Sequence, residues 1–220
     1  MINSLLPNNI ACEFLNESTS NLFVHEAEVK SIQHASKKRV TEFLNARHCA
    51  HKALIKIGYT QNAAILQGTK GEPLWPKSII GSITHCKGYY AAVVSFNKFI
   101  VGIGIDAELN MDISQKLILT TQTENEIFTN TKISNKSPNF FLNKLVFSAK
   151  ESVFKFLFPI VKRYIKFKEI EINLNINKKT FSVILLNSDI SNDFDVTLMI
   201  GKFDYDDNHI VTCCYQQQIN

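Results

Sequence analysis

The chain has 220 residues, of which 45% are hydrophobic and 20% charged, as is typical of a globular protein that can bury a core. Its formal net charge of +4 is too small to indicate a nucleic-acid binder, although it leaves room for a local anion site. No apolar run approaches the roughly 20 residues that cross a bilayer, no signal-peptide pattern opens the chain, and the five cysteines form no CxxC pair, so we expect a cytoplasmic protein with reduced thiols.

The first predicted element is an amphipathic helix that starts near Ser36. Apolar residues recur at helical spacing through SKKRVTEFLNARHCAHKALIKIG, and Gly58 is placed to end the helix. Arg47 falls within the apolar stripe, where an unpaired guanidinium would be costly. Either an internal carboxylate or a bound phosphate should therefore meet Arg47. The basic cluster at residues 37–39 would lie on solvated surface or add positive potential to the same pocket.

Three strands are predicted after the turn-rich segment GTKGEPLWP. The runs IIGSIT, YYAAVVSF and FIVGIGI are rich in β-branched and aromatic residues, and the polar breaks at residues 86–88 and 97–98 indicate hairpins. His85 stands at the end of the first strand, beside a glycine turn. Strand ends of this kind often carry binding groups, and a histidine there can donate a hydrogen bond to a phosphate.

The third strand ends on two carboxylates, Asp106 and Glu108. Because they are two residues apart, their side chains leave the same face of the strand and repel each other. A cation would relieve this repulsion, and an all-oxygen site with few protein ligands suits Mg²⁺. The alternative is an ordinary solvated strand end.

The second half of the chain repeats the order of helix and strands. Residues 116–136 predict a short helix and then a polar loop over TNTKISNKS, and Ser137-Pro138 predicts the start of a long helix that ends near Phe158, before Pro159. Strands follow in KEIEINLNI, TFSVILL, FDVTLMIG and HIVTCCY. We therefore expect an α+β protein of two similar helix-plus-sheet halves, residues 1–108 and 109–220.

The long helix carries the segment FSAKESVFK. Glu151 and Lys155 are four residues apart and share one face, whereas Lys150 lies on an adjoining face. This pattern alone also fits a surface ion pair, which stabilises a helix by roughly 0.3 to 0.5 kcal/mol.

Five motifs together resemble the 4'-phosphopantetheinyl transferases, in particular the enterobactin synthetase group of that family. They are, in order, ARHCAHKAL, GEPLWP, SITHCKGYYAAVV, GIGIDAE and FSAKESVFK, within residues 36–158. The strands after about residue 168 carry no motif of the family. The resemblance implies a pseudo-duplicated α+β fold with coenzyme A in the cleft between the halves.

The resemblance also implies roles for the residues at matching positions. Asp106, Glu108 and Glu151 would hold Mg²⁺ where the halves meet, and Glu151 would act as the general base or position it. Lys155 would assist catalysis. The residues expected to bind the phosphates and pantetheine arm of coenzyme A are Lys38, Arg39, Arg47, Thr84, His85, Lys150 and Lys155, with Glu72 in a matching stretch.

The implied reaction joins coenzyme A to a carrier protein. A carrier serine attacks the phosphorus that bears the pantetheine arm, and adenosine 3',5'-bisphosphate leaves. The expected partners are apo carrier domains of nonribosomal peptide synthases, foremost for a catechol siderophore, with polyketide and fatty-acid carriers left open. We expect a monomeric enzyme whose carrier docks against residues 116–136, near Lys116, Lys132 and Lys136, and against the start of the long helix.

The sequence departs from the family pattern at Thr84, where serine is usual, at Ala107 and at Phe147. No charged catalytic group is lost, so substrate preference rather than activity is in question. Two other functions use the same residue types. A module that binds an acidic partner or nucleic acid would leave the carboxylates unexplained, and a magnesium-dependent phosphohydrolase is disfavoured by the order of the motifs.

Overall fold

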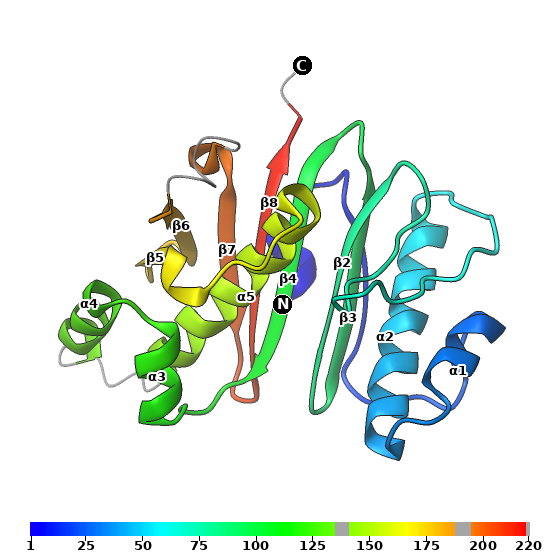
Figure 1. The fold of residues 1–220 in the computed structure, drawn as a ribbon, viewed down its shortest axis with the longest axis horizontal. Helices are drawn as coiled ribbons and strands as arrows, with labels where there is room; N and C mark the ends of the chain where they lie inside the picture. Colours follow the sequence, from blue (N-terminus) through cyan, green and yellow to red (C-terminus); the bar gives the residue numbers. More distant parts are fainter. Residues whose placement is uncertain (135–140, 188–194, 219–220) are drawn as a thin grey trace.

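The computed structural model describes residues 1–134, 141–187 and 195–218, which form two antiparallel sheets with helices packed on them (Figure 1). The smaller sheet has the strand order β1-β3-β2 and the larger one the order β4-β8-β7-β6-β5. The strands are β1 (Ala11–Leu15), β2 (Ile79–Cys86), β3 (Tyr89–Phe96), β4 (Ile100–Leu109), β5 (Ile170–Asn175), β6 (Thr180–Leu185), β7 (Ile200–Tyr205) and β8 (His209–Gln217). The expected α+β class is confirmed.

Five α-helices and three short 3-10 helices are seen in the described residues. The α-helices are α1 (Glu26–Ile32), α2 (Lys37–Lys56), α3 (Gln115–Thr121), α4 (Glu124–Ser134) and α5 (Leu142–Val161), and the 3-10 helices are η1 (Ile2–Leu5), η2 (Phe167–Glu169) and η3 (Val196–Leu198). Within the described ranges, no helix is both long and apolar enough to span a membrane.

Helix α2 packs on the smaller sheet, as the sequence predicts. The hydroxyl of Ser36 caps its start by accepting a hydrogen bond from the backbone of Arg39, and Gly58 leaves the helix with a φ of 79°. Its buried face, which includes Ala50 and Leu54, packs on Ala92 of β3. This packing fixes where each side chain of α2 points.

The predicted hairpin between β3 and β4 is wrong. β4 pairs with β8, so Asp106 and Glu108 belong to the larger sheet. Helix α5 packs directly on β4, and Gly104 permits this approach because a Cβ atom there would collide with the backbone carbonyl of Ser152. Consecutive strands usually pair, and the sequence pattern identifies a strand without naming its partner. The division into halves at residues 108 and 109 stays a prediction.

Side-chain hydroxyls join the two sheets where β2 runs beside β4. The backbone amide of Ile105 donates to the hydroxyl of Ser82 at 3.1 Å, and that of Ala107 donates to the hydroxyl of Thr84 at 3.0 Å. No backbone ladder joins β2 to β4, since β2 pairs with β3 and β4 pairs with β8. We call this contact the hydroxyl seam.

Three boundaries in the second half differ from the prediction. The expected polar loop over residues 129–137 is helical as far as Ser134, because α4 continues there. The proposed start at Ser137-Pro138 lies outside the described residues. Helix α5 runs past Pro159 to Val161, since a proline in the last turn removes only one hydrogen bond, and Lys162 then ends the helix in a left-handed conformation.

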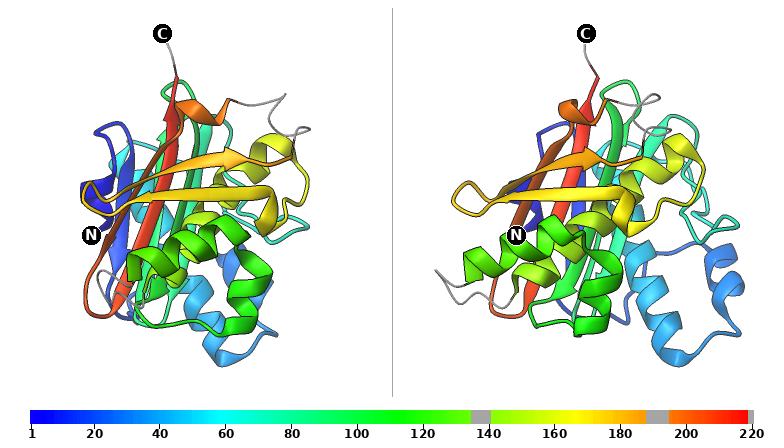
Figure 2. Two further views of the ribbon diagram at one scale, coloured as in Figure 1. Left: turned by 90° about the vertical axis from the view of Figure 1, so that its left-hand side faces the viewer. Right: turned by 60° about the vertical axis from the view of Figure 1, so that its left-hand side comes forward.

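The last predicted boundary concerns FDVTLMIG. Its described part holds η3, and only its last two residues belong to a strand, because β7 begins at Ile200. Helices α3 and α4 lie next to β5, the outer strand of the larger sheet (Figure 2). They connect β4 to α5 in the sequence, and α4 packs against both α5 and β5.

Candidate functional site

A cleft of about 690 Å³ separates α2 and β2 from α5. Arg39, Arg47 and His85 line it from the first half of the chain, and Glu151 and Lys155 line it from the second. Its apolar walls are formed by Phe43, Trp75, Phe154 and Phe158, and the loop over residues 67–75, which includes Glu72, closes one side. Positive groups from one half thus face an acid and a lysine from the other.

Asp106 is the most firmly held carboxylate beside this cleft. It is 5% exposed, and its Oδ1 accepts a hydrogen bond from Lys155 Nζ at 2.7 Å and one from the hydroxyl of Thr84 at 3.3 Å. Its Oδ2 accepts from the hydroxyl of Ser148 at 2.8 Å. Because three side chains from two elements fix its orientation, Asp106 presents a rigid negative charge.

Glu108 and Glu151 share the electrostatic environment of Asp106. Burial, and next the negative charge of Asp106, raise the pKa of both residues, while Lys144 opposes the shift at Glu108 and Lys155 opposes it at Glu151. The Nζ atom of Lys144 donates to Glu108 at 3.1 Å. Three carboxylates therefore repel one another, and of these only Glu151 lines the cleft.

No group of three His, Cys, Asp or Glu side chains lies close enough to hold a metal ion within the part of the chain that the structure describes. The two acids of β4 form ion pairs instead, Asp106 with Lys155 and Glu108 with Lys144. The donor set is nevertheless all oxygen and electrostatically crowded, which is the chemistry that a hard divalent cation relieves. The three residues fit a Mg²⁺ site by their chemistry.

Arg47 is buried, with its guanidinium over the ring of Phe43 at 4.3 Å from the centroid. Its Nε donates to the carbonyl oxygen of Ile65 at 2.6 Å, and burial lowers its pKa to about 10. Among the described residues no carboxylate lies within 4 Å of it; the buried Glu28 opposes the pKa shift from a greater distance, and its oxygens contact His51 and the amide of Ile65 instead. A bound anion remains the other way to compensate this charge.

Two further basic residues of the cleft, Arg39 and His85, contact each other. Arg39 Nη1 lies 3.1 Å from His85 Nε2. Burial lowers the pKa of His85; Glu42 opposes this shift, and the positive charges of Arg39 and Lys155 add to it. Lys38 lies outside this cleft, because its exposed side chain pairs with Glu42 at 3.7 Å and lines a separate pocket.

Thr84 does not line the cleft. It is 3% exposed and its hydroxyl is used within the protein, where it contacts Asp106 and accepts from the backbone of Ala107. Its visible role is to orient the carboxylate strand, which differs from the expected contact with a phosphate.

Lys150 is also away from the cleft, against the expectation that it binds coenzyme A. Its side chain is fully buried, and its Nζ contacts the Glu126 carboxylate at 2.6 Å. The same ammonium donates to the backbone carbonyls of Thr121 and Phe167 at 2.8 and 3.0 Å. With three acceptors inside the protein, Lys150 has no donor left for a ligand.

The sequence reading missed three residues that shape the site. Ser148 and Lys144 hold the carboxylates, and their spacing of three and four from Glu151 and from each other places them on the same helix face, so this signal was available. Glu28 is fully buried and accepts from the backbone of Ile65, whose carbonyl holds Arg47. No pattern in the sequence around Glu28 predicts that role.

Comparisons with known proteins support one family. Residues 26–95 match the model of the 4'-phosphopantetheinyl transferase N-terminal domain, and residues 102–214 match that of the 4'-phosphopantetheinyl transferase superfamily. The 4'-phosphopantetheinyl transferase Npt of Nocardia iowensis is 34% identical over 178 residues, which cover 80% of this chain and 78% of that protein. The corresponding transferase Svp of Streptomyces mobaraensis is 32% identical over 191 residues, 84% of this chain and 76% of that protein.

Two further relatives are more distant or match a shorter stretch. The enterobactin synthase component D of Escherichia coli strain K12 is 37% identical over 127 residues, 56% of this chain and 57% of that protein. The crystal structure of the holo-ACP-synthase from Plasmodium yoelii covers 55% of this chain and 97% of its own, with 17% identity and a TM-score of 0.41.

Proposed function

The chain belongs to the 4'-phosphopantetheinyl transferase superfamily, and from this membership we propose that it moves 4'-phosphopantetheine from coenzyme A to a serine of an apo carrier protein. It is a 4'-phosphopantetheinyl transferase. The observation that carries the finer proposal is the cleft, where two arginines and a histidine of the first half face Glu151 and Lys155 of α5.

The nucleotide end of coenzyme A is assigned to the first half. Arg47 is buried without a carboxylate within 4 Å among the described residues, and Arg39 and His85 stand next to it along the same wall. These groups offer guanidinium and imidazole donors, which form short, charge-assisted bonds to phosphate. The aromatic walls of the cleft would accept the apolar parts of the cofactor.

The carboxylates are assigned to the reacting phosphates. Asp106, Glu108 and Glu151 would hold Mg²⁺, which supplies neutralisation of the pyrophosphate charge. Lys155 lies beside Asp106 and lines the cleft, so it can also contact the phosphoryl oxygens. Lys150 is left out of this assignment because its donors are used inside the protein.

In the proposed reaction the serine hydroxyl of the carrier attacks the phosphorus that bears the pantetheine arm. The new bond joins the serine oxygen to phosphorus, and the bond to the bridging oxygen breaks, which releases adenosine 3',5'-bisphosphate. Glu151 would either accept the serine proton itself or position the base that accepts it.

We infer that the carriers belong to nonribosomal peptide synthesis, foremost of a siderophore. The support is the similarity to enterobactin synthase component D and the shared order of motifs. Five free cysteine thiols are in keeping with a reaction in the reducing cytoplasm.

Product mass decides the proposal. The protein is incubated with coenzyme A, MgCl₂ and a panel of apo carriers from nonribosomal peptide, polyketide and fatty-acid synthesis. Transfer adds the phosphopantetheine group to the carrier and releases adenosine 3',5'-bisphosphate in equal amount. Hydrolysis of coenzyme A without a modified carrier would indicate a phosphohydrolase, and full activity in excess chelator would remove the metal assignment.

A further inference from the structure

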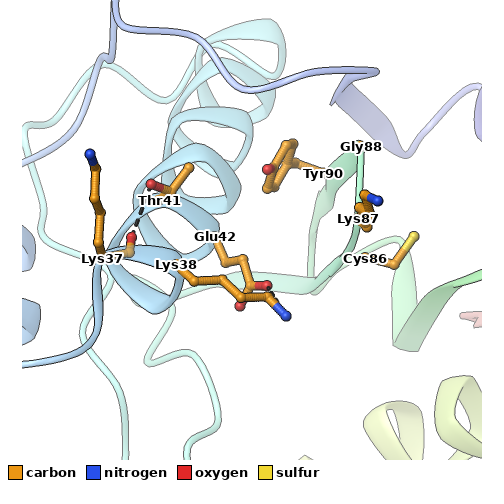
Figure 3. A pocket seen from close by; sticks show the side chains of 8 residues that line it. All are labelled: Lys37, Lys38, Thr41, Glu42, Cys86, Lys87, Gly88 and Tyr90. Carbon is orange, nitrogen blue, oxygen red and sulfur yellow. Dashed lines mark hydrogen bonds and ion pairs between the residues drawn. The ribbon is translucent and has the colours of Figure 1, made fainter.

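A second pocket, of about 550 Å³, lies at the N-terminal end of α2 beside the turn between β2 and β3 (Figure 3). We call it the basic pocket. Lys37, Lys38 and Lys87 line it, with Tyr90 and Cys86 between them. It is distinct from the cleft, since the two share no lining residue.

A thin wall separates the basic pocket from the cleft. Along α2, Glu42 lines the basic pocket and its neighbour Phe43 lines the cleft. Along β2, Cys86 lines the basic pocket and its neighbour His85 lines the cleft. Successive residues of a strand point to opposite faces, so one short stretch of backbone serves both sides. A ligand in the basic pocket therefore lies next to the reaction centre without occupying the nucleotide site.

The basic pocket also borders the end of the carboxylate strand. The backbone carbonyl of Lys87 lies 3.1 Å from His209 Nε2, and His209 pairs with Leu109 at the end of β4. Glu108 and Asp106, in that order, are the nearby charges that help burial to raise the pKa of Cys86. The turn at residues 86–88 is thus fixed against the strand end where the attacking serine must arrive.

The hydroxyl of Tyr90 opens onto the basic pocket. The residue as a whole is 7% exposed, but its hydroxyl is not enclosed by the protein, and no hydrogen bond joins it to a described residue. In Figure 3 the hydroxyl points into the space between the ring and Thr41 of α2. Lys37 and Lys87 form no ion pair with described residues either, whereas Lys38 pairs with Glu42. The pocket thus offers a hydroxyl donor and two exposed ammonium groups to an acceptor of negative charge, and Lys38 compensates the Glu42 carboxylate that also lines it.

We propose that the basic pocket binds an acidic segment of the carrier protein, and that this contact brings the carrier serine to Glu151. The inference rests on the proposed function. Coenzyme A is assigned to the cleft on the other side of the wall, so the pocket stays open while the cofactor is bound. A carboxylate of the carrier would accept from Tyr90 and gain from Lys37 and Lys87, and opposite charges raise the rate of encounter.

The test compares the Michaelis constants of the two substrates. Tyr90→Phe removes only the hydroxyl, and the double variant K37E/K87E reverses the free charges at the rim. K98E is the matched control, because Lys98 is an exposed lysine after the opposite end of β3. Each variant is checked for an unchanged fold by circular dichroism, and transfer is then measured with carrier or coenzyme A varied in turn.

The expected result is a rise of roughly tenfold in KM for the carrier with K37E/K87E, which is within the range of electrostatic steering, and a smaller rise with Tyr90→Phe. KM for coenzyme A and all constants of K98E should stay unchanged. A carrier with acidic surface residues changed to lysine should regain activity with K37E/K87E.

An unchanged KM for the carrier in both pocket variants would overturn the inference, as would a rise in KM for coenzyme A alone, which would assign the pocket to the nucleotide. Failure of the unaltered protein to modify any carrier would contradict the proposed function instead and remove the inference with it.

Discussion

At the scale of single residues, the three carboxylates carry the sharpest consequences. Asp106→Asn, Glu108→Gln and Glu151→Gln keep the size of each side chain but remove a negative charge that would bind Mg²⁺ or accept the serine proton. Each variant should lose at least about 100-fold in transfer rate while it remains folded at the assay temperature. Single-turnover kinetics at saturating coenzyme A measure the loss. Normal transfer by all three would exclude the metal assignment.

His85 should couple coenzyme A binding to pH. Burial, with Arg39 and Lys155, lowers the pKa of its ring, so the free protein holds it mostly neutral at pH 7. A phosphate beside the ring favours the protonated form and raises that pKa, so binding takes up a proton. Affinity should therefore fall as the pH rises from about 6 to 8.

Calorimetry in buffers of different ionisation enthalpy measures this proton uptake. His85→Gln should lower it and should weaken coenzyme A binding about tenfold, and Arg47→Ala should weaken binding at least as much, because charged hydrogen bonds are lost. The affinity of the parent should also fall with added salt. Unchanged affinity in both variants would remove these residues from the nucleotide site.

At the scale of elements, the pair of Lys150 and Glu126 joins α5 to α3 and α4. The Glu126 carboxylate also accepts from the backbone amides of Thr123 and Ile172, which adds β5 to the junction. Lys150→Met would leave a buried carboxylate without its cation, so we expect a loss of roughly 3 to 5 kcal/mol in unfolding free energy.

The matched control for this prediction is Lys155→Met on the same helix. The Lys155 side chain is 27% exposed and lines the cleft, so this variant should lose more transfer activity and less stability than Lys150→Met. Urea denaturation gives the stability, and the affinity for coenzyme A is compared at a temperature where both variants are folded. A large loss of affinity in folded Lys150→Met would restore Lys150 to the binding site.

The contact between β4 and α5 depends on Gly104. A Cβ atom there meets the backbone of Ser152, which cannot rotate away, whereas one at Gly102 meets the ring of Phe156, a side chain. Gly104→Ala should therefore lower the unfolding free energy by about 1 to 3 kcal/mol or more, and Gly102→Ala by less. The same variant should reduce transfer, because Glu151 would shift relative to Asp106. Equal stability of both variants in urea would contradict this account.

At the scale of the whole molecule, we predict that the carrier also contacts the second half of the chain. Phe128 on α4 is 59% exposed, and the Lys132 ammonium lies 4.0 Å from its ring centroid, which is an apolar and basic surface of the kind expected for carrier docking. Phe128→Ser should raise KM for the carrier several-fold and leave that for coenzyme A unchanged. Its effect should add to that of K37E/K87E on a logarithmic scale, since the sites are far apart. An unchanged KM for the carrier in Phe128→Ser would exclude α4 from the docking surface.

The sequence predicts the local parts of this architecture better than their assembly. Capping at Ser36 and Gly58 and the apolar stripe between them define α2, and β-branched runs define the hairpin of β2 and β3, because these signals act between near neighbours. The partner of β4 is β8, which lies about a hundred positions away in the sequence. The inward direction of Lys150 depends on acceptors from several other elements. The site motifs lie around one cleft, but burial decides which of their residues face it.

The hydroxyl seam has a consequence for solubility. β2 and β4 are each an outer strand of their sheet, and such strands offer unpaired backbone groups to other chains. Ser82 and Thr84 occupy the amides of Ile105 and Ala107, so the edge of β4 is closed by side chains of the same molecule. The hydroxyls of Ser82 and Thr84 thus prevent a second copy of the chain from adding a strand at β4, and they also hold β4, which carries the carboxylates, in place.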